Sequence, residues 1–144
     1  MGNLYREMRE RQQEEFNQFP LGAAFGKEQF RAMMEGWGFS VNDTDKIISL
    51  GAGCYIRKTD KDAYREMSRR HEKEREDAIA ADADGTGFIF DMFRYELANH
   101  EYGYTCDPTD AFNACGYDYE DVMNDDRLRA GFGKASAVLL KEAS

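Results

Sequence analysis

The stretch Asp84–Tyr102, DGTGFIFDMFRYELANHEY, determines the fold class more than any other part of the sequence. A glycine-containing turn is followed by apolar residues at helical spacing, so one face of a helix beginning near Phe88 is apolar. The residues of that face are Phe88, Ile89, Met92, Phe93 and Leu97. The stretch therefore predicts a buried amphipathic helix with a helical domain built around it.

Four other segments have the same spacing of apolar residues. They cover residues 4–19, 30–37, 60–83 and 126–141. The two prolines of the chain fall between these segments, where a missing backbone N–H does not interrupt a helix. The whole pattern predicts a mainly α protein.

One segment departs from helical patterning. Residues 47–58, IISLGAGCYIRK, combine glycines with the β-prone run Cys54–Ile56. We expect one short strand or hairpin near residues 50–58.

Two similar corners interrupt the helices. Gly38 and Gly116 each end a helical segment, and Ser40 and Asp118 follow as candidate N-caps with an acid three residues later. We expect a helix to begin after each of these two caps.

The 144 residues are enough for one compact domain of common size. We therefore expect a single domain over residues 1–144, with an N-terminal helix at residues 1–20 on its periphery. The N-terminal segment is charged from Arg6 onward, and no apolar run reaches the length of a membrane span. These features predict a cytoplasmic protein with no membrane partner.

The negative charge is concentrated in one part of the chain. The net charge is −9, and residues 82–126 contain twelve acids and a single base, Arg94. The same window contains nine aromatic residues. This charge disfavours direct binding of nucleic acid. It indicates either an acidic surface that keeps the protein in solution or a surface that binds a cationic partner.

If the acidic segment binds a partner, its exposed acids and tyrosines are the candidate contacts. Tyrosine adds contact area at low entropic cost, and carboxylates resemble the charges of a phosphate backbone. The candidate partner-binding residues are Tyr102, Tyr104, Asp107, Asp110, Asp118, Glu120 and Asp121.

A second group of candidate residues is titratable and lies on the apolar sides of two predicted helices. Glu96 and His100 lie four residues apart on the apolar side of their predicted helix, and His71 lies on the apolar side of another. Two histidines and a carboxylate are a possible divalent-metal set or a general acid/base pair. The alternative is that these groups are buried and satisfy their own hydrogen bonds. No ligand motif supports the metal, so we expect no cofactor.

Two strings resemble a known group of proteins. They are DTDKIISLGAGCYIRKTD at Asp43–Asp60 and YELANHEYGYTCDPTDAFNACGYDYEDV at Tyr95–Val122. They are similar to an uncharacterised family of small acidic proteins encoded by bacteriophages and bacterial mobile elements, over roughly residues 14–130. The resemblance implies an accessory protein that acts on host machinery, CRISPR effectors and other defence enzymes among it.

The first hypothesis is a non-enzymatic protein in the cytoplasm of a bacterial host, which binds a basic, nucleic-acid-binding surface of a host protein. An inhibitor of a CRISPR or other defence nuclease that acts by nucleic-acid mimicry is the specific form of this hypothesis. A second hypothesis is a metal-dependent enzyme or regulator that uses His71, Glu96 and His100. A third is a self-associating structural protein, and the sequence leaves the oligomeric state open.

Overall fold

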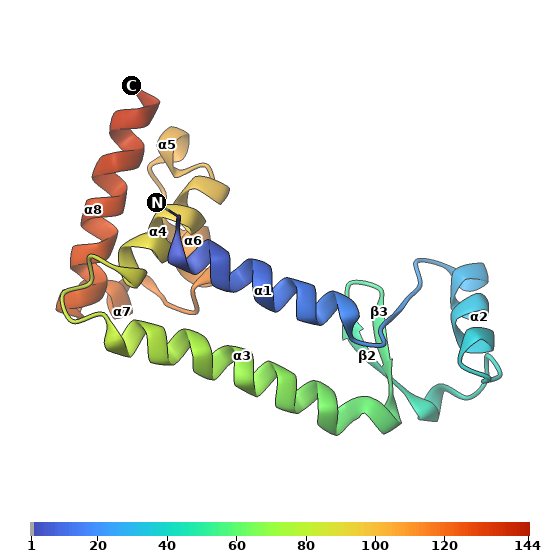
Figure 1. Ribbon diagram of the computed structural model, residues 1–144. Coiled ribbons are helices and arrows are strands. Elements are labelled where there is room, and N and C mark those ends of the chain that lie inside the picture. The colour runs from blue at the N-terminus through green and yellow to red at the C-terminus, as the bar shows by residue number, and fades with distance from the viewer. Residues whose placement is uncertain (1) are drawn as a thin grey trace. The chain divides into compact units, whose positions relative to one another are not determined.

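Helices form most of the chain in the computed structural model, which describes residues 2–144. In this range the chain forms eight α-helices and a three-stranded antiparallel sheet (Figure 1). The prediction of a mainly α protein with one short strand or hairpin near residues 50–58 is confirmed, and the element present is a hairpin. By packing, the chain divides into two units. Unit 1 consists of the residues up to Gln12 together with Lys73–Ser144, and unit 2 is Gln13–Glu72. One domain over residues 1–144 stays a prediction.

Unit 1 is built around α4 (Phe88–Asn99), the helix that the first sequence stretch predicts. It packs against α5 (Tyr102–Thr105), α6 (Thr109–Ala114) and α8 (Asp126–Ala143), and α7 (Tyr119–Met123) packs against α6 and α8. Three aromatic rings, Phe93, Phe112 and Phe132, meet edge to face in the core. Edge-to-face packing of this kind adds to the free energy gained by burying apolar area.

A close approach of α8 to the turn before α4 fixes the packing of unit 1. A Cβ atom added to Gly131 would lie 2.6 Å from both the Gly85 carbonyl oxygen and the Ile89 side chain. Gly85 itself has φ of +82°, and an added Cβ would meet the Arg127 carbonyl group. Glycine is therefore required at both positions for the helices to approach this closely.

The N-terminal helix, α1 (Leu4–Gln18), belongs partly to unit 1. Tyr5 is 1% exposed and Met8 is 3% exposed, and both are core residues of this unit. The expectation of a peripheral N-terminal helix is therefore wrong for its first half. The charged residues Arg6, Arg9 and Glu10 suggested a surface helix, but they leave one buried stripe between them.

Unit 2 contains the small sheet and α2 (Lys27–Gly36). The strands β1 (Gly22–Ala23), β2 (Ile47–Gly51) and β3 (Cys54–Arg57) lie in the order β1-β3-β2. In the β2–β3 hairpin Ile48 is opposite Ile56, which is 1% exposed. The sequence predicted a short strand or hairpin here but not β1, because a two-residue strand leaves no periodic pattern.

The second part of α1 and the first part of α3 (Lys61–Ala81) also belong to unit 2. The rings of Phe16 and Phe19 contact Tyr64 of α3 edge to face. Next to these rings, the Glu15 carboxylate accepts hydrogen bonds from Arg70 at 2.6 Å and 3.0 Å, and one of its oxygens lies 2.7 Å from His71 Nε2.

Helices were predicted to begin after Ser40 and after Asp118, and the prediction for Ser40 is wrong. Asp118 begins α7 as expected. Ser40 does make cap-like hydrogen bonds, because its N–H donates to Asp43 and its hydroxyl accepts from Asn42, but only a short 3-10 turn at Thr44–Lys46 follows. The next residues, beginning at Ile47, enter the sheet instead, so the local cap does not start a helix.

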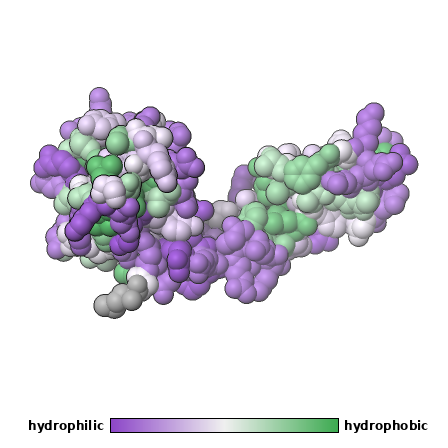
Figure 2. Space-filling view, turned by 90° about the horizontal axis from the view of Figure 1, so that it is seen from above, coloured by the Kyte–Doolittle hydropathy of each residue, from purple (hydrophilic) through white to green (hydrophobic). Residues whose placement is uncertain are grey.

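Within residues 2–144 no helix combines the length and the apolar character that crossing a bilayer requires. Figure 2 shows hydrophobic areas (green) between hydrophilic ones (purple) on the visible face. From Gly2 onward, six large hydrophobic residues are exposed: Leu4, Phe25, Val41, Tyr104, Tyr119 and Leu140.

Candidate functional site

Among the described residues of unit 1, Tyr104 is the most exposed large apolar side chain, at 88%. It lies on α5, a helix of one turn that is bounded by Glu101 and Cys106. Both of these residues adopt the left-handed conformation, with φ of +58° and +57°. This conformation costs non-glycine residues free energy, and strain of this kind is concentrated at functional sites. The fold thus presents Tyr104 to solvent on a strained turn.

Tyr102, on the same turn, does not belong to an exposed surface. It is 7% exposed, its ring contacts Phe132, and its hydroxyl lies 2.8 Å from Ser136 Oγ. The prediction of Tyr102 as a partner contact is therefore wrong. The two tyrosines are two positions apart on a helix and point to different sides, so only one of them reaches solvent.

The acids predicted near α5 are exposed. Asp107 accepts hydrogen bonds from the backbone N–H and the hydroxyl of Thr109, which lowers the pKa of its carboxyl. Asp110 follows Thr109 in the first turn of α6. Together with Glu101 and Tyr104 they form what we call the α5 acidic group.

The remaining predicted contacts lie on α7. Asp118 and Asp121 form a capping box, in which each carboxylate accepts the backbone N–H of the other residue. Glu120 lies between them and is exposed, and Tyr119 is 61% exposed. We call these four residues the α7 acidic group.

The two acidic groups lie toward opposite ends of α8 (Figure 1). Gly103 of α5 lies beside Ala143 and Leu139, near the C-terminal end of α8. The carbonyl of Met123, the last residue of α7, accepts a hydrogen bond from Arg129 in the first turns of α8. A helix of 18 residues is about 27 Å long. The acidic residues thus extend along unit 1 rather than gathering at one point.

Most acids of the segment have a structural role as hydrogen-bond acceptors, which helps to explain their number. Seven of the twelve accept a backbone N–H with the side chain, and several of these acceptors lie at or just before the first turn of a helix. The seven are Asp82, Asp84, Asp91, Asp107, Asp118, Asp121 and Asp125. Short helices that follow one another closely need many caps, so acidity here is partly a consequence of the fold.

Glu96 is buried at 3% exposure and is held by residues that the sequence did not connect with it. The Tyr5 hydroxyl donates to its carboxylate at 2.6 Å, and the Arg9 guanidinium lies 3.4 Å away. Burial and this hydrogen bond raise the pKa of Tyr5, so the phenol stays protonated as the donor. Glu96 is therefore satisfied by α1.

The candidate metal ligands His71, Glu96 and His100 do not all belong to the same unit. His100 Nε2 lies 4.0 Å from Glu96 in unit 1, whereas His71 belongs to unit 2 and contacts Glu15. In the described part of the chain, no group of three or more His, Cys, Asp or Glu side chains is arranged to hold a metal ion.

Cys115 is the buried thiol of unit 1, at 2% exposure. Burial, with the nearby charge of Glu96, raises the pKa of this thiol to about 12. A thiol that stays protonated at neutral pH is a poor nucleophile. Cys115 is therefore a core residue.

Sequence reasoning missed three contributors to these sites: Tyr119, Glu101 and Tyr5. The sequence did contain a signal for Tyr119, because this residue lies between the predicted contacts Asp118 and Glu120. Glu101 belongs to the acidic segment and is adjacent to Tyr102, but its place at the left-handed start of α5 is visible only in the structure. Tyr5 contacts Glu96, from which it is 91 positions away in the sequence. Helical periodicity relates only residues a few positions apart, so it does not predict this contact.

These features define a mainly α protein with a small antiparallel sheet in one unit and an extended acidic surface on the other. The chain belongs to a family of unknown function, DUF7659, whose model matches residues 4–138. No curated protein and no solved structure matches it.

Proposed function

We propose that this chain is a non-enzymatic binding protein that docks the α5 and α7 acidic groups on a cationic surface of another protein. The observation that carries the proposal is Tyr104, 88% exposed on a turn bounded by two left-handed residues. An exposed aromatic ring among carboxylates is suited to insert between basic side chains, because it adds apolar contact where the charges attract.

The charge distribution supports the same proposal. Unit 1 contains 18 Asp and Glu residues against 10 Lys and Arg residues, whereas unit 2 has 10 against 9. Nearly all of the net charge of −9 is therefore in the unit that carries Tyr104. A concentrated field of one sign speeds encounter with a partner of the opposite sign.

The specific form of the proposal is nucleic-acid mimicry. Two acidic groups separated along α8 can contact two points of a groove that normally binds a phosphate backbone. The partner would then be a host nuclease or another nucleic-acid-binding protein, CRISPR effectors among them. Origin in a phage or mobile element, and action in the bacterial cytoplasm, belong to the same proposal.

A capture experiment with matched charge variants tests the docking. The tagged protein is incubated with bacterial lysate at low and high salt, and bound proteins are identified by mass spectrometry. The variant D110K/E120K reverses one exposed acid in each group. The control E35K/E66K makes the same charge change at exposed acids of unit 2.

We expect wild type and E35K/E66K to capture the same partner at low salt and to release it at high salt. D110K/E120K and Y104A should lose it. Undiminished capture by D110K/E120K would rule out this surface. Mimicry is tested separately with the purified partner: a nucleic acid that the partner binds should displace the protein, and a stable ternary complex would contradict mimicry while leaving the docking intact.

A further inference from the structure

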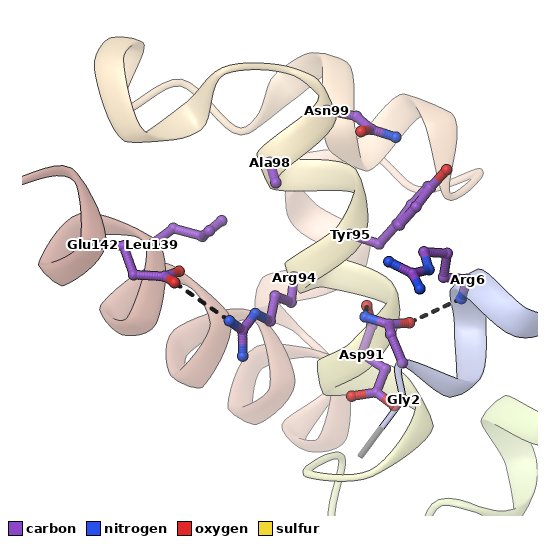
Figure 3. A pocket seen from close by; sticks show the side chains of 10 residues that line it. Gly2, Arg6, Asp91, Arg94, Tyr95, Ala98, Asn99, Leu139 and Glu142 are labelled. Atoms are coloured by element: carbon purple, nitrogen blue, oxygen red, sulfur yellow. Dashed lines mark hydrogen bonds and ion pairs between the residues drawn. The ribbon is translucent and has the colours of Figure 1, made fainter.

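Unit 1 contains a pocket of about 590 Å³ that the acidic surface does not use (Figure 3). Its floor is α4, one wall is the start of α1, and the other wall is the end of α8. This volume lies within the range of pockets that bind small molecules.

Two polar residues of the pocket are already engaged in holding α1 to α4. Asn3 donates to the Asp91 carbonyl at 2.9 Å and accepts the Arg6 N–H at 2.9 Å. The Asp91 carboxylate accepts the Leu4 N–H at 2.8 Å. These groups form part of the pocket wall and have little capacity left for a ligand.

Two guanidinium groups of the pocket, those of Arg94 and Arg6, remain for binding a ligand. Each is held only by an exposed ion pair. Arg94 lies 3.4 Å from Glu142, with both side chains about half exposed, and Figure 3 shows it reaching across the pocket toward α8. Arg6 lies 3.3 Å from Glu10 in a similarly exposed pair. Exposed ion pairs of this kind contribute about 0–1 kcal/mol, so another anion can replace the carboxylate.

Arg94 is also the only Lys or Arg among residues 82–126. Next to it in the pocket are two apolar side chains, Ala98 and Leu139. A polyanion would be repelled by the surrounding acids of unit 1, whereas a small anion with an apolar body can gain from both surfaces.

We infer that this pocket binds a small organic anion, with a carboxylate or phosphate group at Arg94 and an apolar body against Ala98 and Leu139. Arg6, on the opposite wall, adds a second positive charge to the pocket. Glu142 competes with the ligand for Arg94. The inference is independent of the docking of the acidic groups, since none of these residues belongs to them.

Benzoate, phenyl phosphate and inorganic phosphate are suitable probes, and binding is followed by the amide NMR shifts of Ala98 and Leu139 in the full chain. We expect both organic anions to bind, and inorganic phosphate to bind at least about tenfold more weakly because it lacks the apolar body. Tighter binding of phenyl phosphate assigns a phosphate ligand, and tighter binding of benzoate assigns a carboxylate.

Matched variants separate the pocket from overall charge. R94Q should weaken binding of the organic anions about tenfold, whereas R129Q, which removes an exposed arginine at the other end of α8, should not. E142Q should tighten binding about threefold, whereas E66Q in unit 2 should not. The inference is overturned if neither organic anion shifts these amides, if inorganic phosphate binds equally well, or if each variant behaves as its control does.

Discussion

At the scale of single residues, the buried carboxylate of Glu96 shows how unit 1 uses a charge in its core. Burying a carboxylate is costly unless it is paired and hydrogen-bonded. Tyr5 and Arg9, both from α1, supply the partners. The N-terminal helix is thus attached to α4 by a polar contact as well as by apolar packing.

Replacing Tyr5 with Phe tests this contact. Y5F removes the hydroxyl that donates to Glu96 at 2.6 Å and leaves that buried carboxylate oxygen with only the longer contact of 3.4 Å from Arg9. We expect the free energy of unfolding to fall by about 1–3 kcal/mol, measured by urea denaturation. Y104F removes the same hydroxyl at a side chain that is 88% exposed, and should change stability by less than about 0.5 kcal/mol. Equal effects of the two variants would contradict the role of the buried pair.

At the scale of elements, the glycines of α8 offer a test of helix packing. In G131A the new Cβ would lie 2.6 Å from the Gly85 carbonyl oxygen, so α8 must move away from the turn before α4. We expect a loss of about 1–3 kcal/mol in urea denaturation. Gly133 is on the same helix and has nothing within 4 Å of its added Cβ. G133A should therefore stabilise the protein by about 0.5–1 kcal/mol, because alanine is the better helix former.

The contact between α1 and α3 in unit 2 depends on pH. Hydrogen bonds from Arg70 and His71 lower the pKa of the Glu15 carboxyl to about 2. In the unfolded chain a glutamate titrates near about 4.3, so the contribution of Glu15 to stability is complete above that pH and is lost as the pH falls toward 2.

The variant E15Q checks this dependence. We expect the melting temperature of wild type to fall more steeply than that of E15Q between about pH 5 and pH 2, as measured by circular dichroism. E14Q, at the neighbouring exposed residue, should follow wild type. Parallel curves for wild type and E15Q would show that the ion pair does not contribute.

For the whole molecule, the net charge of −9 sets the response to salt. Like charges in unit 1 repel one another, and salt screens this repulsion. We expect the melting temperature to rise between about 20 and 200 mM NaCl, and to rise less in D110N/E120Q, which removes two exposed acids. A melting temperature that falls with salt would mean that attractive ion pairs outweigh the repulsion.

The sequence predicted the features that depend on residues close together in the chain, and it missed those that depend on residues far apart. Apolar spacing predicted α4 and α8 because a helix repeats its pattern within a few residues. The cap at Asp118 was also predicted, since both partners of its capping box lie within four residues. At Ser40 the same local signal failed, because the chain that follows pairs with β3 instead of continuing as a helix.

The sequence by itself determined the helical class, the presence of β structure near residues 50–58 and the concentration of acids in one segment, since each depends on neighbouring residues. Only the tertiary structure decided that Tyr102 is buried while Tyr104 is exposed, that Tyr5 satisfies Glu96, and that the predicted acidic contacts divide into two groups along α8. These outcomes depend on contacts between residues far apart in the chain. Such contacts arise from packing, and packing leaves no periodic mark in the sequence.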